Sequence, residues 1–303
     1  MEQIYQIYDR IFKRIFNLSA LAIINLINGL FGTNYQPDST VHFCNKEFVG
    51  RKLSHRFADV IVLINGDAYH LEAQMYKDSA IVVRVFEYGF QYALENREDD
   101  DYLCFPEPIV IYLDTENKVP RTSTLLLDFA GQGTFEFSVR NLVYQEEELV
   151  ELNRKKMVVL IPFQLLKLKK MVKNGITKET LKALQNLIEN DILGSIKANF
   201  QVGNITRDDA DQLIEMTNLL YQHICDHYEE LKGAGEMKPL LDGAMELPLD
   251  KYRIQIDQLE AEKAEVEAEK VAIGAEKAAI EAEKLRLEKE NKELREQIER
   301  LKK

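Results

Sequence analysis

The pair Asn65-Gly66, between two β-prone apolar runs, constrains the fold of this chain more than any other feature. An Asn-Gly pair in this setting predicts a two-residue hairpin loop, because both of its residues accept positive φ. Such a loop pairs residues whose numbers sum to 131, so Asp59 is expected directly opposite Glu72. Because side chains alternate between the two faces of a strand, Gln74 should point the same way as Glu72.

This pairing would place two carboxylates close together. Directly opposed Cβ atoms lie about 5 Å apart, and like charges at that distance are unfavourable. A divalent cation bound by Asp59 and Glu72 would relieve the repulsion, and hard cations prefer carboxylate and carbonyl oxygens. The backbone carbonyl of Ala73 is the candidate third ligand, with Mg²⁺ as the expected ion and Mn²⁺ or Ca²⁺ as other candidates. The alternative is a solvent-facing sheet edge with ordinary polar residues, and the spacing alone leaves the two equally open.

Two neighbouring side chains have restricted roles. Gln74 cannot act as a general base, but its amide could hold a water or a phosphate oxygen. His70 shares the Glu72 face if the strand is regular, and it is expected to be a partly exposed strand histidine or a peripheral proton carrier.

Charge and cysteine content narrow the class of protein. The formal net charge is −12, and the 14 acidic and 13 basic residues from Lys251 onward nearly cancel, so the preceding body carries about −11. This acidic charge argues against a protein that coats nucleic acid generally. Any contact with DNA would have to come from local basic patches. Three widely separated cysteines indicate reduced thiols and a cytoplasmic location. The longest apolar runs are too short or too interrupted by polar residues to span a membrane.

Hydrophobic periodicity predicts an α/β fold with a mixed sheet flanked by helices. One face of the first helix after the hairpin should carry Val82, Val83, Phe86, Phe90 and Leu94. Gly131-Gln132-Gly133 could cradle a phosphate, but without a P-loop lysine it predicts a turn between strands. The expected order is a helix at 3–30, strands at 40–49, 56–64 and 68–75, a helix at 79–96, and strands at 109–113, 124–130 and 134–144.

Composition divides the chain into four parts: an α/β domain over 1–150, a helical region over 151–232, a Gly/Pro-rich linker over 233–250, and a heptad repeat over 251–303. The helical region should contain helices at 162–173, 177–194 and 206–231. Thr177 and Thr206 are the expected N-caps of the last two.

The last part has a seven-residue repeat. Its apolar d column runs Leu259, Val266, Ile273, Ile280, Leu287, Leu294 and Leu301. This pattern predicts a left-handed coiled coil and a homodimer, in which Asn291 at an a position favours a parallel arrangement in register. Lysines fill most other a positions and weaken the seam, so a single charged helix held by i,i+3 and i,i+4 pairs is the alternative.

Several short motifs, taken together in their order, resemble a known superfamily. Asp59, a hairpin and Glu72-Ala73-Gln74 are similar to the core of PD-(D/E)XK nucleases in their E-x-Q variant, which has a restriction-endonuclease-like fold. More closely, residues of roughly 3–145 resemble the recombination-promoting nuclease/transposase family of that superfamily. The matching pieces are Asp9-Arg10-Ile11-Phe12-Lys13, Phe57-Ala58-Asp59-Val60, Leu71-Glu72-Ala73-Gln74, and Arg84 with Tyr88.

The resemblance implies a metal-dependent DNA endonuclease that hydrolyses phosphodiester bonds, with Asp59 and Glu72 as metal ligands. Gln74 replaces the lysine usual in the superfamily, which leaves the activation of the attacking water open. Asp9 could approach the metal and Lys13 a phosphate, or the two could form an i,i+4 surface ion pair. Arg84 and Tyr88 share a helix face and are expected either to contact phosphate or to form a buried packing pair.

Two basic groups are candidates for DNA contact. Arg56 ends the first, which also contains Arg51, Lys52 and His55. The second has seven basic residues and no acidic one between Arg154 and Lys173, and a solvated helix face is its alternative. A non-catalytic interaction protein, with a degenerate nuclease fold on a coiled-coil stalk, is the alternative function.

Overall fold

The computed structural model describes residues 2–44, 58–97, 99, 101–115, 118–168, 178–227 and 238–301. The chain divides into two compact units, Met1–Arg253 and Ile254–Lys303, and each is described on its own.

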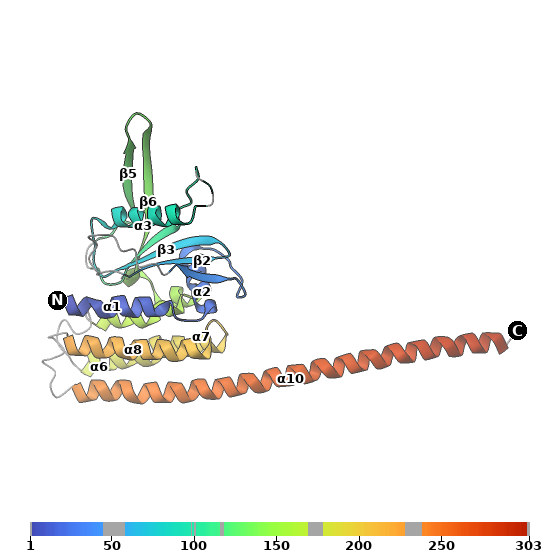
Figure 1. The fold of residues 1–303 in the computed structure, drawn as a ribbon. Helices are drawn as coiled ribbons and strands as arrows, with labels where there is room; N and C mark the ends of the chain where they lie inside the picture. The colour runs from blue at the N-terminus through green and yellow to red at the C-terminus, as the bar shows by residue number, and fades with distance from the viewer. Residues whose placement is uncertain are drawn as a thin grey trace. The chain divides into compact units, whose positions relative to one another are not determined.

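A six-stranded mixed sheet forms the centre of the first unit, in the order β1-β2-β3-β4-β6-β5 (Figure 1). β1, β2 and β3 are antiparallel neighbours, β3, β4 and β6 run parallel, and β5 pairs antiparallel with β6. The predicted α/β class with a mixed sheet is thus confirmed. The strands are β1 Val41–Cys44, β2 Ala58–Ile64, β3 Asp67–Gln74, β4 Glu107–Tyr112, β5 Thr122–Phe129 and β6 Gly133–Val143.

The hairpin between β2 and β3 has the predicted loop. Asn65 has φ 53° and Gly66 has φ 98°, the two positive values that a type I′ turn requires. The Asn65 side chain also accepts a hydrogen bond from the Thr40 N–H (3.0 Å), which ties the loop to the start of β1. The backbones of Asp59 and Glu72 are direct partners in the ladder, so the predicted register is confirmed.

Helices cover the two faces of the sheet. α1 Glu2–Ile15 and α2 Ala20–Phe31 lie on one face, and α3 Ile81–Glu95 lies on the other (Figure 1). Aromatic contacts fix the first arrangement, since Phe16 meets Phe43 of β1 and Phe31 meets Tyr69 of β3. On the opposite face, α3 packs Ile81, Val82 and Val85 against Val110, Tyr112 and Val139.

The expectation of one helix over 3–30 is wrong. The chain turns after Ile15, and Ser19 begins α2 by accepting a hydrogen bond from the Ala22 N–H (3.2 Å). Asp209, fully buried, accepts from both the N–H (2.7 Å) and the hydroxyl (2.6 Å) of Ser19. A tertiary contact therefore stabilises a break that apolar periodicity does not reveal. α2 ends at the αL residue Gly32, close to the end expected at residue 30.

The side of α3 predicted to carry Val82, Val83, Phe86, Phe90 and Leu94 is only partly buried, because Val83, Phe90 and Leu94 are exposed. The helix turns Val85 and Gly89 to the protein instead, and a Cβ on Gly89 would lie 3.0 Å from the Phe105 ring. The outer aromatic residues form their own cluster, in which Phe86 stacks on Phe90 and Phe105 and meets Phe137 edge-on.

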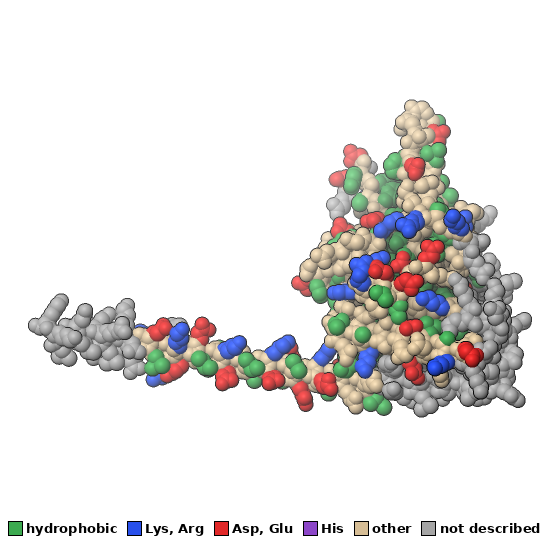
Figure 2. Space-filling view, turned by 180° about the vertical axis from the view of Figure 1, so that it is seen from behind, with side chains coloured by type: hydrophobic (Ala, Val, Ile, Leu, Met, Phe, Trp, Pro, Cys, Tyr) green, Lys and Arg blue, Asp and Glu red, His purple; other side chains and the backbone are tan. Residues whose placement is uncertain are grey.

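The β5–β6 hairpin extends beyond the sheet as an arm, with a turn at 130–132 as predicted. The Gln132 N–H donates to the Phe129 carbonyl (2.7 Å), and Gly131 and Gly133 have positive φ. Leu126 and Phe135 are exposed on this arm. Figure 2 shows hydrophobic and acidic side chains on it but no basic ones.

The helical region after the sheet is made of short segments. The helix expected at 162–173 begins earlier, as the 3₁₀ helix η2, and its residues are buried throughout. Thr206 is confirmed as an N-cap, since its hydroxyl accepts from the Asp209 N–H (3.1 Å), whereas Thr177 lies outside the described residues. The segments are η1 Tyr144–Glu146, α4 Leu149–Arg154, η2 Val158–Leu166, α6 Lys178–Asn186, η3 Leu187–Leu193, α7 Gly194–Gln201 and α8 Arg207–His227.

The last helix, α10, runs from Lys238 to Leu301. The linker expected over 233–250 is therefore helical from residue 238 on, and its first five residues lie outside the described range. Pro239 falls in the first turn of the helix, where a missing N–H costs nothing. Among the described residues, none of the helices combines the length and the apolar character that a membrane span requires.

Candidate active site

β3 presents three polar side chains to the face of the sheet that α3 covers. His70, Glu72 and Gln74 alternate along the strand with Leu71 and Ala73, and each of the three polar residues is only 1% exposed. A solvent-facing sheet edge, one of the two readings of this pattern, is therefore wrong. Buried polar groups of this kind require partners, and α3 supplies the main one.

The Glu72 carboxylate is held by two donors. Arg84 of α3 donates from Nη2 to Glu72 Oε1 (2.9 Å), and Gln74 donates from Nε2 to the same oxygen (2.6 Å). The other terminal nitrogen of Arg84 donates to Asp78 Oδ2 (3.1 Å). Arg84 thus bridges a buried carboxylate on the strand and a half-buried one just before the helix.

Local sequence explains how the bridge is built. Asp78 accepts from the Ala80 N–H (2.9 Å), which orders the turn that leads into α3. Arg84 then lies in the first turn of the helix, directly above β3. Because the guanidinium is planar and has several N–H donors, it can pair with two carboxylates at once.

The titratable groups around this pair are perturbed by burial. Desolvation, and secondarily the nearby Arg84 charge, lowers the pKa of His70 to about 4, so its imidazole is neutral at physiological pH. Burial, and then the charge of Asp78, raises the pKa of Tyr112 to about 12, so its phenol stays protonated. His70 is fully buried, so the expectation of a partly exposed histidine is wrong.

The predicted site residues divide into three groups. Glu72, Gln74 and Arg84 are brought together, and Tyr88 lies beside His70 with ring centroids 6.1 Å apart, as a packing pair would. Lys13 is exposed on α1, which covers the opposite face of the sheet. Arg56 and the side chains of Asp9 and Asp59 lie outside the described residues, although the backbone of Asp59 is described in its pairing with Glu72.

Two residues of this cluster were not expected from the sequence. Asp78 could have been suspected, because an aspartate just before a helix commonly orders its first turn. Tyr112 lies at the end of β4, where it pairs in parallel register with Gln74, and only the strand order brings it there.

The donor types suit a hard cation, but the described residues do not complete a metal site. Carboxylate and carbonyl oxygens are the ligands that Mg²⁺ prefers. Within the described part of the chain, no group of three or more His, Cys, Asp or Glu residues is placed to hold a metal. Ala73 and Glu72 could contribute a carbonyl and a carboxylate oxygen, and a complete site would need Asp59.

Four of the seven residues of the second basic group are described. Arg154 ends α4, Lys155 and Lys156 follow it, and Lys167 follows η2, whereas Lys169, Lys170 and Lys173 lie outside the described ranges. Arg154 forms a bidentate pair with Glu151 and is thus a solvated helix residue.

Comparisons of the chain with protein-family models, with curated proteins and with solved structures gave no match.

Proposed function

We propose that this protein is a metal-dependent DNA endonuclease that hydrolyses phosphodiester bonds. One observation carries the proposal: Glu72 is a buried carboxylate, directly paired in the hairpin with Asp59 and flanked by Gln74 and Arg84. The order α1, α2, β1, β2, β3, α3, β4 also supports it, since apart from the division of the first helix into α1 and α2 it is the element order of the PD-(D/E)XK core that the motifs resemble.

In this proposal Asp59, Glu72 and the Ala73 carbonyl would hold Mg²⁺, which would supply Lewis acidity toward a phosphoryl oxygen. Gln74 acts as a positioning residue, because its amide donates to Glu72 Oε1 and fixes the carboxylate. Arg84 balances the charge of Glu72. Its guanidinium is also the candidate donor to a phosphate that approaches Glu72. The pKa of His70 is lowered to about 4, so its buried imidazole stays neutral and does not change its protonation state near neutral pH.

The test is cleavage of supercoiled plasmid and of linear DNA with Mg²⁺, Mn²⁺ or Ca²⁺, and with EDTA. We expect the wild type to cleave with Mg²⁺ or Mn²⁺, and Asp59→Asn and Glu72→Gln to lose at least about 100-fold, the order of removing one strong electrostatic stabiliser. Glu136→Gln, on the exposed part of the β5–β6 arm, is the matched control and should retain full activity. An inactive wild type with every metal and DNA form, or both site variants cleaving normally, refutes the proposal.

A second candidate function is that of a non-catalytic interaction protein. The specific observation in its favour is that Arg84 already provides Glu72 with a counter-ion at 2.9 Å, so the carboxylate does not need a metal for charge balance. Calorimetry with Mg²⁺ and Mn²⁺ separates the two functions. Binding that is lost in Asp59→Asn supports the nuclease, and the absence of binding supports the interaction protein.

A further inference from the structure

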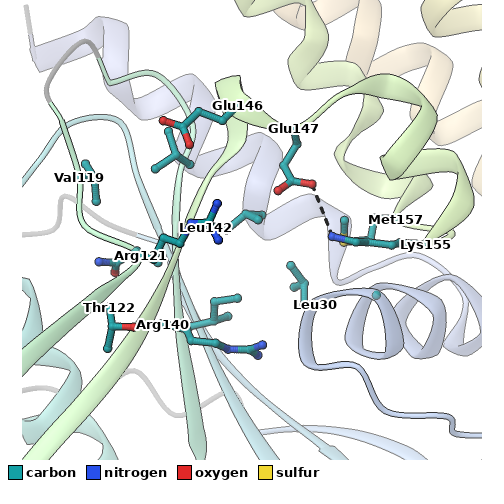
Figure 3. A pocket seen from close by; sticks show the side chains of 14 residues that line it. Leu30, Val119, Arg121, Thr122, Arg140, Leu142, Glu146, Glu147, Lys155 and Met157 are labelled. Carbon is teal, nitrogen blue, oxygen red and sulfur yellow. Dashed lines mark ion pairs between the residues drawn. The ribbon is translucent and has the colours of Figure 1, made fainter.

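A cavity of about 440 Å³ lies between the sheet and the helices on the side away from α3 (Figure 3). Its walls come from α2, the start of β4, the base of the β5–β6 hairpin, η1 and the end of α4. This volume is within the range of about 300–1,000 Å³ that is typical of small-molecule sites.

The cavity is separate from the Glu72 cluster, because the sheet lies between them. Arg140 of β6 lines the cavity, and its guanidinium lies 5.1 Å from the centre of the Phe31 ring on α2. Its neighbour Val139 points the other way and packs in the core beneath α3. The alternation of side chains along β6 thus assigns Arg140 and Glu72 to opposite faces.

Three cationic side chains border the cavity from separate elements: Arg121, Arg140 and Lys155 (Figure 3). Arg140 lies 3.8 Å from Glu107, and Lys155 lies 3.6 Å from Glu147. Both distances exceed the 2.7–3.2 Å or so of a good hydrogen bond, so these are loose ion pairs. Arg121 has no ion pair within the described part of the chain. The N–H donors of Arg121 are therefore available to an anion, and those of Arg140 and Lys155 are only loosely paired.

The backbone that carries Arg121 is fixed to β6. The Asn141 N–H donates to the Arg121 carbonyl (2.8 Å), and the Asn141 side chain donates to the Pro120 carbonyl (2.9 Å) and to Ser123 Oγ (2.7 Å). Arg121 thus has an ordered backbone position directly before β5, whose first residue, Thr122, pairs with Arg140 in the ladder.

Lys155 is brought to the rim by a close helix approach. A Cβ on Gly29 would lie 2.7 Å from the Lys155 carbonyl oxygen and 2.4 Å from Met157 Cγ, so only glycine lets α2 and the end of α4 meet here. The next residue, Lys156, has φ 57°, a left-handed conformation that is unfavourable for a non-glycine residue. A lysine therefore occupies a position where glycine would be less strained.

The local charge favours anions despite the acidity of the whole chain. Glu146 and Glu147 oppose the three cations of the cavity. An adjoining hollow of about 580 Å³ shares Gly29 and Lys155 with it and adds Arg154 and Lys156, with no acidic residue in its lining.

We propose that this cavity binds a small phosphate-bearing molecule, with its phosphates between Arg121 and Arg140. Arginine pairs are well suited to phosphate, because each guanidinium can donate two parallel hydrogen bonds. A diphosphate carries more negative charge than a monophosphate and therefore competes better with Glu147 for Lys155. Leu30 and Met157 provide an apolar wall for the rest of the molecule.

The test is calorimetric titration of the full chain with pyrophosphate and with ADP. We expect binding that weakens at least tenfold in the double variant Arg121→Gln, Arg140→Gln, and that persists in Arg154→Gln. Arg154→Gln is the control, because Arg154 lines only the adjoining hollow and not the cavity itself. If the double variant is unfolded by circular dichroism, the single variant Arg121→Gln, at an exposed side chain, takes its place.

Three results would overturn this proposal: no binding of either probe by the wild type, an equal loss in Arg154→Gln, or no loss in the double variant. A DNA oligonucleotide provides the remaining comparison. If the oligonucleotide binds through Arg121 and Arg140 while pyrophosphate and ADP do not, the phosphates belong to a nucleic acid and the small-molecule site is refuted. Glu72→Gln should leave pyrophosphate binding unchanged, so this site and the proposed nuclease can fail separately.

Discussion

At the scale of single residues, the contact between Arg84 and Glu72 dominates the candidate active site. Glu72 is fully buried, and the Arg84 side chain is only 13% exposed. Isolated buried charges are expensive, so each of these two residues depends on the other. The hydrogen bond from Gln74 adds a neutral donor to the same oxygen and fixes the carboxylate orientation.

Removing Arg84 should therefore destabilise the protein. We expect Arg84→Gln to lower the free energy of unfolding by about 3 kcal/mol in EDTA, because an uncompensated carboxylate remains buried. If Asp59 and Glu72 hold a metal, Mg²⁺ should restore stability to this variant more than it stabilises the wild type. Urea unfolding with and without Mg²⁺ measures both effects.

The matched control is Arg154→Gln, which removes an exposed arginine whose pair lies on the surface. Its stability should be indistinguishable from that of the wild type, since exposed ion pairs contribute little. An unchanged stability of Arg84→Gln would show that the Glu72 carboxylate is not held by this contact.

At the scale of elements, the β2–β3 hairpin determines which side chains can share a site. Its loop fixes the register, and a shift by one residue would turn Glu72 and Gln74 to the opposite face. Local chemistry was sufficient to predict this hairpin, because the Asn65-Gly66 pair specifies the turn by itself. It was not sufficient for the break between α1 and α2, where buried Asp209, far along the chain, supports the turn at Ser19.

Changing the loop glycine should have a cost that comes from the backbone alone. Gly66 has φ 98°, and a Cβ there would meet no atom within 4 Å. We expect Gly66→Ala to lower stability by about 1–2 kcal/mol, through the unfavourable φ. Thermal unfolding followed by circular dichroism measures the loss.

Gly274 in α10 offers the opposite case, since it is a helix-interior glycine that also has open space around it. Gly274→Ala should leave the body unaffected and increase helicity, because alanine is favoured there by about 0.5–1 kcal/mol. If Gly66→Ala were as harmless as Gly274→Ala, the turn would not be under the constraint assigned to it.

At the scale of the whole molecule, α10 carries an apolar stripe that its own chain leaves in solvent. Val266, Ile273, Ile280 and Leu287 of the predicted d column are between 45% and 62% exposed. Figure 2 shows hydrophobic side chains between acidic and basic ones along the helix. An exposed stripe at seven-residue spacing is what a coiled-coil partner would cover, so we expect a parallel homodimer.

Sedimentation equilibrium tests this expectation. The measured mass of the full-length protein should be twice the chain mass of 35.1 kDa. The double variant Ile273→Glu, Ile280→Glu should be a monomer, because charged side chains would enter the interface between the two helices. Val271→Glu is the control, since Val271 is also an exposed apolar residue of α10 but lies off the d column. A monomeric wild type, or dimers that persist in the double variant, would favour the alternative of a single charged helix.

The sequence by itself determined the hairpin register, the α/β class and the seven-residue repeat of the tail. Each depends on short-range chemistry: a turn that requires positive φ, the alternation of side chains along a strand, and the spacing of apolar residues on a helix. These rules state which side chains share a face, but they do not state which face another element will cover.

Only the tertiary structure decided that Glu72 and Gln74 are buried beneath Arg84, and that His70 is neutral in that environment. It also decided that Arg121, Arg140 and Lys155 border one cavity. Burial and the convergence of charges depend on how α3, α2 and α4 pack on the sheet. That packing is set by the summed contacts of residues far apart in the sequence, and no local pattern records it.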